Sequence, residues 1–546
     1  MTPYQLSIAA LLRHGAAIHA DSVVRCYDGE RVERCTYADV VADAARLAAG
    51  LESLGLGPGD RIGVGLWNTR EHLAAFLAIP AMGATIHTVN PRLSAEQLTF
   101  VLADAEDRLL VLDATMLPAF AGVDLGPVEH VVVVGGVDDA AHAALAALDR
   151  PWTPHGALVD GRPETYEWRD GDELDVATLC YTTGTTGEPK GAAYTQRHVV
   201  LHSLGECSAN TLAISRDDVV MPISPMFHVN AWGLPYTAWL AGADLVLTGR
   251  HVQGEHLIRL IEQERPTVAA GVPTILADVL RCGEGRALDL SSLRLLMSGG
   301  SPVPRAVVEQ FDRRWGVPVT QALGMTENGL LALARPPAGA DREEAIGWRS
   351  RTGRVIAGVE VRAVAEDGTP LPADGESAGE LEVRGWWVVG SYWNGRGADR
   401  FRDGWLRTGD VGTVDRSGWI EISDRLKDVI KSGGEWISSV AVEAAAMEHP
   451  AVAEAAVIAV PDERWFERPL VCVALRDGAR LSPGELRAFL AERLQSWWLP
   501  ERVAFVAAVP KTSVGKFDKK ALRRQLQDGE LEIELTRSAS DAPARP

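Results

Sequence analysis

The feature that most limits the fold of this chain is an alternation of strand and helix patterns along residues 1–425. The apolar runs 131–134 and 219–223 are bounded by turn residues, as buried strands are, whereas 42–54 and 256–264 carry apolar residues at helical spacing. Alternating strands and helices predict a layered α/β architecture. With 546 residues, the chain is long enough to form two or more domains.

The pattern changes twice towards the C-terminus. Residues 353–418 contain short strands separated by turns, which predicts a small β-barrel-like subdomain. Beyond Asp424, strand- and helix-length segments suffice for a compact α+β domain of about 100 residues. We therefore expect an α/β fold with a large N-terminal domain over 1–423 and a small C-terminal domain over 424–527. The polar segment 528–546, rich in Ala, Ser and Pro, is expected to be disordered.

Composition excludes several classes of partner. The formal net charge of −20 argues against nucleic acid or an anionic membrane surface. The six cysteines are dispersed without a Cys-x-x-Cys pair, so neither a disulfide framework nor a zinc site is indicated. Because the N-terminus has no basic leader and no run of about 18 apolar residues occurs, we expect a cytoplasmic protein without a membrane span.

Lysine is rare, and its positions are informative. Only seven of the 54 basic residues are lysines, and they occur in three segments: Lys190; Lys427 and Lys431; and Lys511, Lys516, Lys519 and Lys520. A slim ammonium fits where a planar guanidinium would crowd. Chance survival of lysines in an arginine-rich chain is the alternative, but clustering beside glycines favours a functional role.

The segment 182–191, Thr-Thr-Gly-Thr-Thr-Gly-Glu-Pro-Lys-Gly, combines glycines, hydroxyls and one lysine. Its N–H groups and hydroxyls can converge on phosphate oxygens, with Lys190 as counter-charge. The spacing differs from Gly-x-x-x-x-Gly-Lys-[Ser/Thr], because Lys190 follows Gly187 by three residues. A flexible surface loop is the alternative, but the apolar flanks favour an anchored phosphate-binding loop.

Four further segments are ambiguous when each is taken alone. Taken alone, Glu327 in 321–327 is compatible with a solvated surface carboxylate, and Asp410 in 405–410 with a structural Asx-turn. The charged segment 424–436, with its double glycine, is compatible with a hinge, and 510–520 with a solvated basic surface. The order of the segments along the chain gives them a joint meaning.

In this order, the five segments resemble the motifs of the adenylate-forming superfamily of acyl-CoA synthetases, adenylation domains and luciferases. Segment 182–191 is similar to its phosphate loop, 325–327 to its Thr-Glu signature and 408–410 to its ribose-binding Asp motif. Asp424-Arg425 looks like its hinge and Gly515-Lys516 like its mobile lysine. Segments 225–233 and 431–439 resemble the medium- and long-chain fatty acyl-CoA ligase branch, and the likeness covers about residues 5 to 525.

The resemblance implies ATP-dependent activation of a medium-chain fatty or aryl carboxylic acid. An acyl-adenylate forms with release of pyrophosphate, the mobile C-terminal domain rotates, and CoA takes the acyl group as a thioester with release of AMP. ATP and Mg²⁺ are the implied cofactors, and CoA is a co-substrate. The partners are thus small molecules. The sequence does not specify the oligomeric state, and a homodimer is one possible form.

The same resemblance assigns roles to individual residues. Catalytic roles fall to Thr182, His228, Glu327 and Lys516, with Glu327 also the Mg²⁺ ligand. The acid pocket would contain His228, Val229 and Trp232, and the CoA channel Gly433, Gly434 and Trp436. The nucleotide would bind Thr182, Thr183, Gly184, Thr185, Thr186, Lys190, Gly300, Ser301, Ala322, Leu323, Gly324, Thr326, Asp410, Arg425 and Lys516.

Three departures from the family pattern leave alternatives open. Leu323 stands where an aromatic residue usually stacks on adenine, Ala322 where glycine is common, and Gln196 where this branch often has histidine. One alternative is an activating enzyme of specialised metabolism, such as one for nitrite-dependent diazotisation of an aryl amine or for acyl loading of a carrier protein. Another is a catalytically inactive binding protein, against which the retained Lys190 and Glu327 argue.

Overall fold

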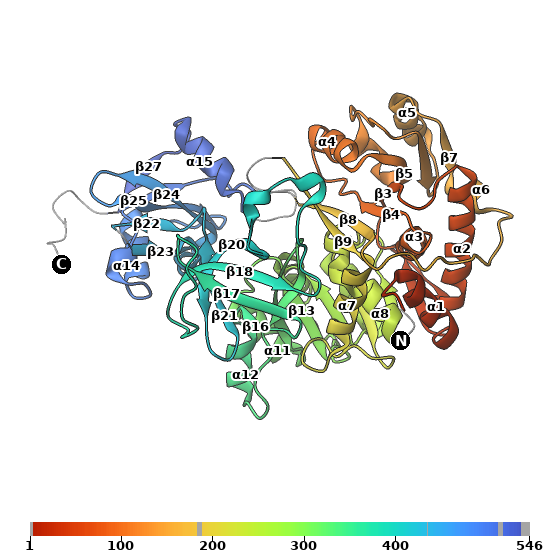
Figure 1. Cartoon of the computed structure of the whole chain (residues 1–546). Coiled ribbons are helices and arrows are strands. Elements are labelled where there is room, and N and C mark those ends of the chain that lie inside the picture. Colours follow the sequence, from red (N-terminus) through yellow and green to blue (C-terminus); the bar gives the residue numbers. More distant parts are fainter. Residues whose placement is uncertain (1–3, 183–187, 434, 512–516, 537–546) are drawn as a thin grey trace. The chain divides into compact units, whose positions relative to one another are not determined.

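The computed structural model describes residues 4–182, 188–433, 435–511 and 517–536 (Figure 1). The chain divides into two compact units, Met1–Val361 with Val383–Leu406, and Arg362–Glu382 with Arg407–Pro546. Asp424 lies inside the second unit, and a hinge there stays a prediction, because a hinge is defined by movement. Among the described residues no helix has the length and apolarity needed to cross a membrane.

The first unit contains a seven-stranded sheet in which all neighbours are parallel except β8 and β9. Parallel strands are covered on both faces, which explains apolar runs such as 131–134. In spatial order the strands are β7 (Trp152–Pro154), β6 (His130–Val134), β5 (Asp107–Asp113), β3 (Arg61–Gly65), β4 (Thr85–Thr88), β8 (Val176–Thr182) and β9 (Lys190–Thr195).

A second sheet of this unit is parallel from β1 to β14 and antiparallel at β2, β15 and β16. Its order is β16 (Gly353–Val355), β15 (Gly329–Leu333), β14 (Val319–Met325), β13 (Leu295–Gly299), β12 (Val268–Gly271), β10 (Val219–Pro222), β11 (Asp244–Leu247), β1 (Val23–Tyr27) and β2 (Val32–Thr36).

Several helices of the first unit begin at side-chain caps. Thr36 and Asp39 form a capping box at the start of α2, and Thr195 and His198 form another at α7. The helices are α1 (Ile8–Ile18), α2 (Tyr37–Ser53), α3 (Arg70–Ala81), α4 (Ala95–Ala105), α5 (Asp139–Leu148), α6 (His155–Val159), α7 (Gln196–Cys207), α8 (Leu234–Ala241), α9 (Gly254–Glu264), α10 (Pro273–Cys282), α11 (Arg305–Trp315) and α12 (Arg342–Arg349), with 3₁₀ segments η1 (Ala114–Phe120), η2 (Val229–Gly233), η3 (Trp393–Gly395) and η4 (Ala398–Arg400).

Apolar faces of these helices close the core over the sheets. Leu257 and Ile261 of α9 and Leu276 of α10 belong to one buried cluster with Met221 of β10 and Ala269 of β12. At about 25 cal/mol per Å² of apolar surface removed from water, such contacts dominate the stability of the unit. The core thus holds the strand ends, where the candidate site lies, on a packed scaffold.

The second unit is built from short strands followed by an α+β region. Strands β17 (Val359–Val364), β18 (Gly379–Gly385), β20 (Trp405–Val414) and β21 (Trp419–Arg425) are successive neighbours, and the unit boundary passes through β17, β18 and β20. The remaining elements are β22 (Ile430–Ser432), β23 (Glu435–Ile437), α13 (Ser439–Met447), β24 (Val452–Asp462), β25 (Phe466–Leu475), α14 (Pro483–Ala491), η5 (Ser496–Trp498), β26 (Arg502–Phe505), α15 (Lys519–Gln527) and β27 (Ile533–Leu535).

The predicted α/β fold class is confirmed, and the predicted strands and helices at 131–134, 219–223, 42–54 and 256–264 coincide with β6, β10, α2 and α9. The structure differs from the predicted disordered tail in one part: β27 pairs antiparallel with β26, and the Thr536 hydroxyl donates to the Pro500 carbonyl at 2.8 Å. Composition averaged over 528–546 cannot reveal a three-residue edge strand. Residues 537–546 lie outside the described chain.

Candidate active site

The predicted phosphate loop connects β8 to β9. Thr182 and Lys190 form the last pair of this hairpin, and β8 is parallel to β4. Thr182 therefore lies at the carboxyl end of a parallel strand, where α/β proteins bind ligands. The Lys190 ammonium lies 5.5 Å from the centre of the Tyr392 ring. Thr183, Gly184, Thr185 and Thr186 lie outside the described residues.

The Thr-Glu signature follows β14 directly. Glu327 is 6% exposed, and its Oε1 accepts a hydrogen bond from the Tyr392 hydroxyl. The carbonyl of Thr326 accepts a hydrogen bond from the hydroxyl of Tyr194, a residue of β9. Two predicted site residues therefore contact the same tyrosine: Lys190 lies over the ring of Tyr392, and Glu327 accepts from its hydroxyl.

Five residues predicted to bind the nucleotide lie at the ends of two adjacent parallel strands. Gly300 and Ser301 follow β13, which pairs with β14 through Ala322. Leu323 is half-buried, and the register of β14 against β15 shifts between Leu323 and Gly324. These five residues therefore share one edge of the sheet, as a common ligand requires.

The predicted acid-pocket residues lie in or beside η2. Residues 229–232 all have positive φ, between 48° and 59°. This conformation is costly for residues with a branched or bulky side chain, such as Val229 and Trp232, and persists only where the surroundings impose it. Asn230 supplies part of that constraint, since its Nδ2 donates to Thr178 Oγ1 at 3.1 Å. His228 immediately precedes the turn.

In the second unit, the predicted ribose-binding pair is assembled. Asp410 of β20 pairs with Arg425 of β21, and Arg425 Nε lies 2.7 Å from Asp410 Oδ1. The Asp410 N–H donates to Thr408 Oγ1 at 3.0 Å. The arginine side chain is 47% exposed and the aspartate 8%, so the carboxylate is held from one side by a solvent-facing cation.

Two of the residues predicted for the CoA channel, Gly433 and Trp436, lie where β22 is followed by β23. Gly433 has a φ of 62°, and a Cβ there would lie 2.7 Å from the Trp465 ring, so only glycine fits without movement. Trp436 lies in β23 opposite Lys431. Gly434 and Lys516 lie outside the described residues.

Tyr392 was not predicted to belong to the site. It is 65 residues from Glu327, and no local motif marks it as functional. The departure at Gln196 has a structural explanation instead: Oε1 accepts from Ile8 N at 2.8 Å and Nε2 donates to the Pro80 carbonyl at 3.0 Å. Gln196 thus joins three segments of the first unit.

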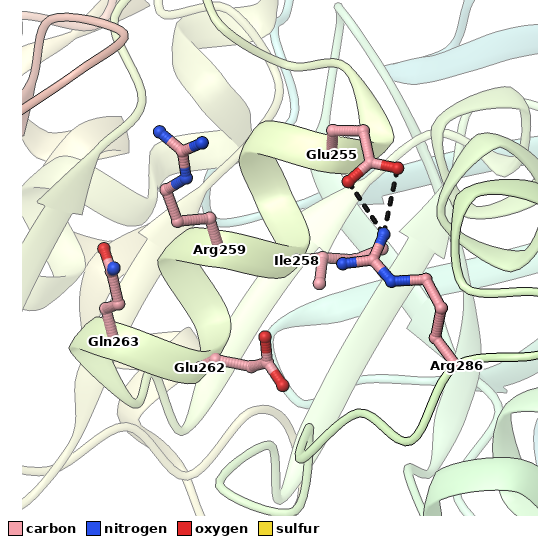
Figure 2. A pocket seen from close by; sticks show the side chains of 6 residues that line it. All are labelled: Glu255, Ile258, Arg259, Glu262, Gln263 and Arg286. Atoms are coloured by element: carbon pink, nitrogen blue, oxygen red, sulfur yellow. Dashed lines mark hydrogen bonds and ion pairs between the residues drawn. The ribbon is translucent and has the colours of Figure 1, made fainter.

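A hollow on the surface of α9 is lined by none of these residues. Figure 2 shows Arg286 directed at Glu255, whose two oxygens lie 2.9 and 2.8 Å from Nη1. The other lining residues are Ile258, Arg259, Glu262 and Gln263. An exposed ion pair of this kind contributes little stability and indicates no ligand.

Across the described chain, no cluster of three or more His, Cys, Asp or Glu residues is arranged to hold a metal.

Comparison with known proteins identifies the family. The AMP-binding enzyme model matches residues 12–393, and the AMP-binding enzyme C-terminal domain matches 441–516. The chain belongs to the AMP-binding enzymes, the adenylate-forming superfamily, and is an AMP-forming acid–thiol ligase. It activates a carboxylic acid with ATP through an acyl-adenylate and transfers the acyl group to CoA.

Similar proteins agree with this class. The 3-methylmercaptopropionyl-CoA ligase of Ruegeria pomeroyi is 41% identical over 530 residues, covering 96% of this chain and 98% of the relative. The medium-chain-fatty-acid–CoA ligase of Ectopseudomonas oleovorans is 38% identical over 531 residues, covering 96% of each chain. The structure of the anthranilate CoA ligase AuaEII with anthranoyl-AMP is similar at a TM-score of 0.84 and 26% identity, over 97% of this chain and 98% of that chain.

Proposed function

We propose that the acid activated by this enzyme is a medium-chain fatty or aryl acid. The names of similar proteins support this range, since they include ligases for medium-chain fatty acids and anthranilate. The observation that carries the proposed reaction site is the convergence of Lys190 and Glu327 on Tyr392 at the strand ends of the first unit. A cation and a carboxylate held this way suit the triphosphate of ATP and its metal ion.

Glu327 fits the role of the Mg²⁺ ligand by its chemistry. Magnesium usually binds one or two protein carboxylates and completes its shell with phosphate oxygens and water, so a single buried carboxylate suffices. One oxygen of Glu327 is engaged by Tyr392, and the other is the atom we assign to the metal. When bound, the ion would neutralise phosphate charge in the displacement.

The remaining groups would position the two anions that must meet. Thr182, the loop after it and Lys190 would hold the phosphates, while His228, Val229 and Trp232 would place the acid. Asp410 would accept hydrogen bonds from the ribose hydroxyls with Arg425 beside it. Electrostatic stabilisation by oriented groups of this kind is usually the largest contribution to such reactions.

Lys516 is assigned the role of bridging carboxylate and α-phosphate in the first half-reaction. Movement about Asp424 would then bring Gly433, Gly434 and Trp436 to the acyl-adenylate for the CoA step. These assignments follow the motif positions in the sequence. The cytoplasmic location and the homodimer stay predictions as well.

The test is a panel of acids assayed for AMP, pyrophosphate and acyl-CoA, with and without CoA. We expect CoA-dependent turnover with a medium-chain or aryl acid. Diazotisation and carrier-protein loading are not favoured, because the relatives named above are CoA ligases. Nitrite with an aryl amine forms a separate arm, and AMP release that needs nitrite but no CoA would overturn the proposal.

A further inference from the structure

Tyr392 touches two groups that the proposed reaction needs. Its hydroxyl donates to Glu327 Oε1, and its ring face lies beneath the Lys190 ammonium, 5.5 Å from the ring centre. Tyr392 is 3% exposed and Glu327 6%, so their hydrogen bond is shielded from water, while Lys190 is half-buried. A charge-assisted hydrogen bond and a cation over an aromatic face both strengthen as water is excluded.

The direction of this hydrogen bond follows from the two groups themselves. A phenol O–H can donate, whereas a carboxylate oxygen only accepts, so the Tyr392 hydroxyl donates to Glu327 Oε1. Glu327 is left with one oxygen engaged and one available.

The segment that carries Tyr392 is anchored to β9, to α4 and to the predicted phosphate loop. Tyr392 forms a β-bridge with Ala192 of β9. Four residues further on, Arg396 Nε lies 2.8 Å from Asp104 Oδ1 and Arg396 Nη1 lies 3.0 Å from Glu188 Oε2. Glu188 belongs to the predicted phosphate loop, so the tyrosine is fixed to that loop and not only to Glu327.

Glycine at 397 completes the arrangement around the lysine. A Cβ there would lie 2.9 Å from Lys190 Nζ, so a larger residue would displace the ammonium. The backbone of the segment also contacts the backbone of Glu327, since Val389 N donates to the Glu327 carbonyl at 2.9 Å. The segment 389–397 thus holds both charged groups from one side.

We propose that Tyr392 is a positioning residue that holds the Glu327 carboxylate and the Lys190 ammonium in one arrangement for Mg²⁺-bound ATP. Its hydroxyl orients the carboxylate, and its ring places the ammonium. The proposal rests on the assignment of Glu327 to the metal and Lys190 to the phosphates. No role in moving protons or electrons is assigned to it.

The test compares Tyr392→Phe with Tyr392→Leu. The phenylalanine variant loses only the hydroxyl, and hydrogen bonds to charged groups are worth about ten- to a hundredfold in an equilibrium. We expect the Mg²⁺ concentration for half-maximal ATP–pyrophosphate exchange to rise at least about fivefold. Mn²⁺ binding to the enzyme–ATP complex, followed by electron paramagnetic resonance, should weaken in parallel, while ATP binding in EDTA should stay within about twofold.

The leucine variant also loses the ring, so ATP binding in EDTA should weaken as well. Tyr37→Phe is the matched control. Tyr37, in α2, is another buried tyrosine, and the substitution removes a hydroxyl that donates to the Ala243 carbonyl at 2.5 Å. Normal Mg²⁺ and Mn²⁺ responses in Tyr392→Phe would overturn the proposal, whatever happens to thermal stability. Glu327→Gln separates the two assignments: if it too leaves both metal responses normal, the metal role of Glu327 is wrong.

Discussion

At the scale of single residues, Leu323 is the departure with the clearest kinetic consequence. We expect Leu323→Tyr to lower the KM for ATP about fivefold, because stacking on adenine is worth about 1 kcal/mol. Leu323 is only half-buried near the end of β14, so a larger aromatic side chain could extend towards solvent there. Steady-state kinetics with the best acid give the measurement.

The opposite outcome is equally informative. If tyrosine intrudes on a packed site, kcat should fall without a gain in ATP affinity, at a cost of about 1–3 kcal/mol. Kinetics unchanged in both parameters would show that position 323 does not contact the nucleotide.

A second residue-scale prediction concerns Glu206 of α7. It is fully buried, its Oε2 accepts from the Thr237 hydroxyl at 2.5 Å, and burial raises its pKa from 4.5 to about 8. The folded state therefore binds this proton more tightly than the unfolded state. The stability that this residue contributes is complete below pH 4.5 and is lost as the pH rises to about 8.

Glu206→Gln should remove that dependence. Relative to the variant, the wild-type protein should lose about 1 kcal/mol of unfolding free energy for each pH unit between 5 and 8. Denaturation midpoints of both proteins across this range provide the measurement. The neighbouring His202, whose pKa burial lowers to about 4, stays neutral in the same window. A constant difference between the two proteins at every pH would contradict the assignment.

At the scale of elements, a buried network joins α15 to α13 in the second unit. Lys519 Nζ lies 2.8 Å from Glu443 Oε1 and donates to Ser439 Oγ at 2.6 Å. Asp424 Oδ2 accepts from Ser439 N at 2.5 Å. The start of α15, three residues after Lys516, is therefore tied to the strand that ends at the predicted hinge.

Lys519→Met should destabilise the second unit by about 3–5 kcal/mol, because it leaves a buried carboxylate unpaired. Lys520→Met is the matched control, since the adjacent lysine is exposed. Chemical denaturation of both variants measures the difference. Equal stability of the two variants would show that the network contributes nothing.

Sequence patterns predicted elements well where burial is continuous. The valine run 131–134 consists of apolar, β-branched residues, which favour a buried strand, and it forms most of β6. Motifs likewise marked Lys190, Glu327 and Asp410 as candidates, because each motif is local in sequence, and the roles of these residues stay predictions. Tyr392 and the left-handed turn at 229–232 could not be predicted, since each depends on contacts with distant segments such as Glu327 and Thr178. The edge strand β27 was missed because three residues carry no periodicity.

At the scale of the whole molecule, the reaction has two steps, adenylation and transfer to CoA. A small domain that moves between them would explain why Lys516, the predicted hinge and the predicted CoA-channel residues all occur after residue 423. The two family models also divide the chain, at 12–393 and 441–516. Both steps nevertheless depend on one intermediate, the acyl-adenylate.

Isotope transfer tests that intermediate directly. If the acid attacks the α-phosphate of ATP, one carboxylate oxygen remains on AMP when CoA takes the acyl group. With an acid labelled with ¹⁸O at both carboxylate oxygens, mass spectrometry of the products should show one ¹⁸O in each AMP and none in pyrophosphate. Unlabelled AMP, or label in pyrophosphate or phosphate, would contradict activation through an acyl-adenylate.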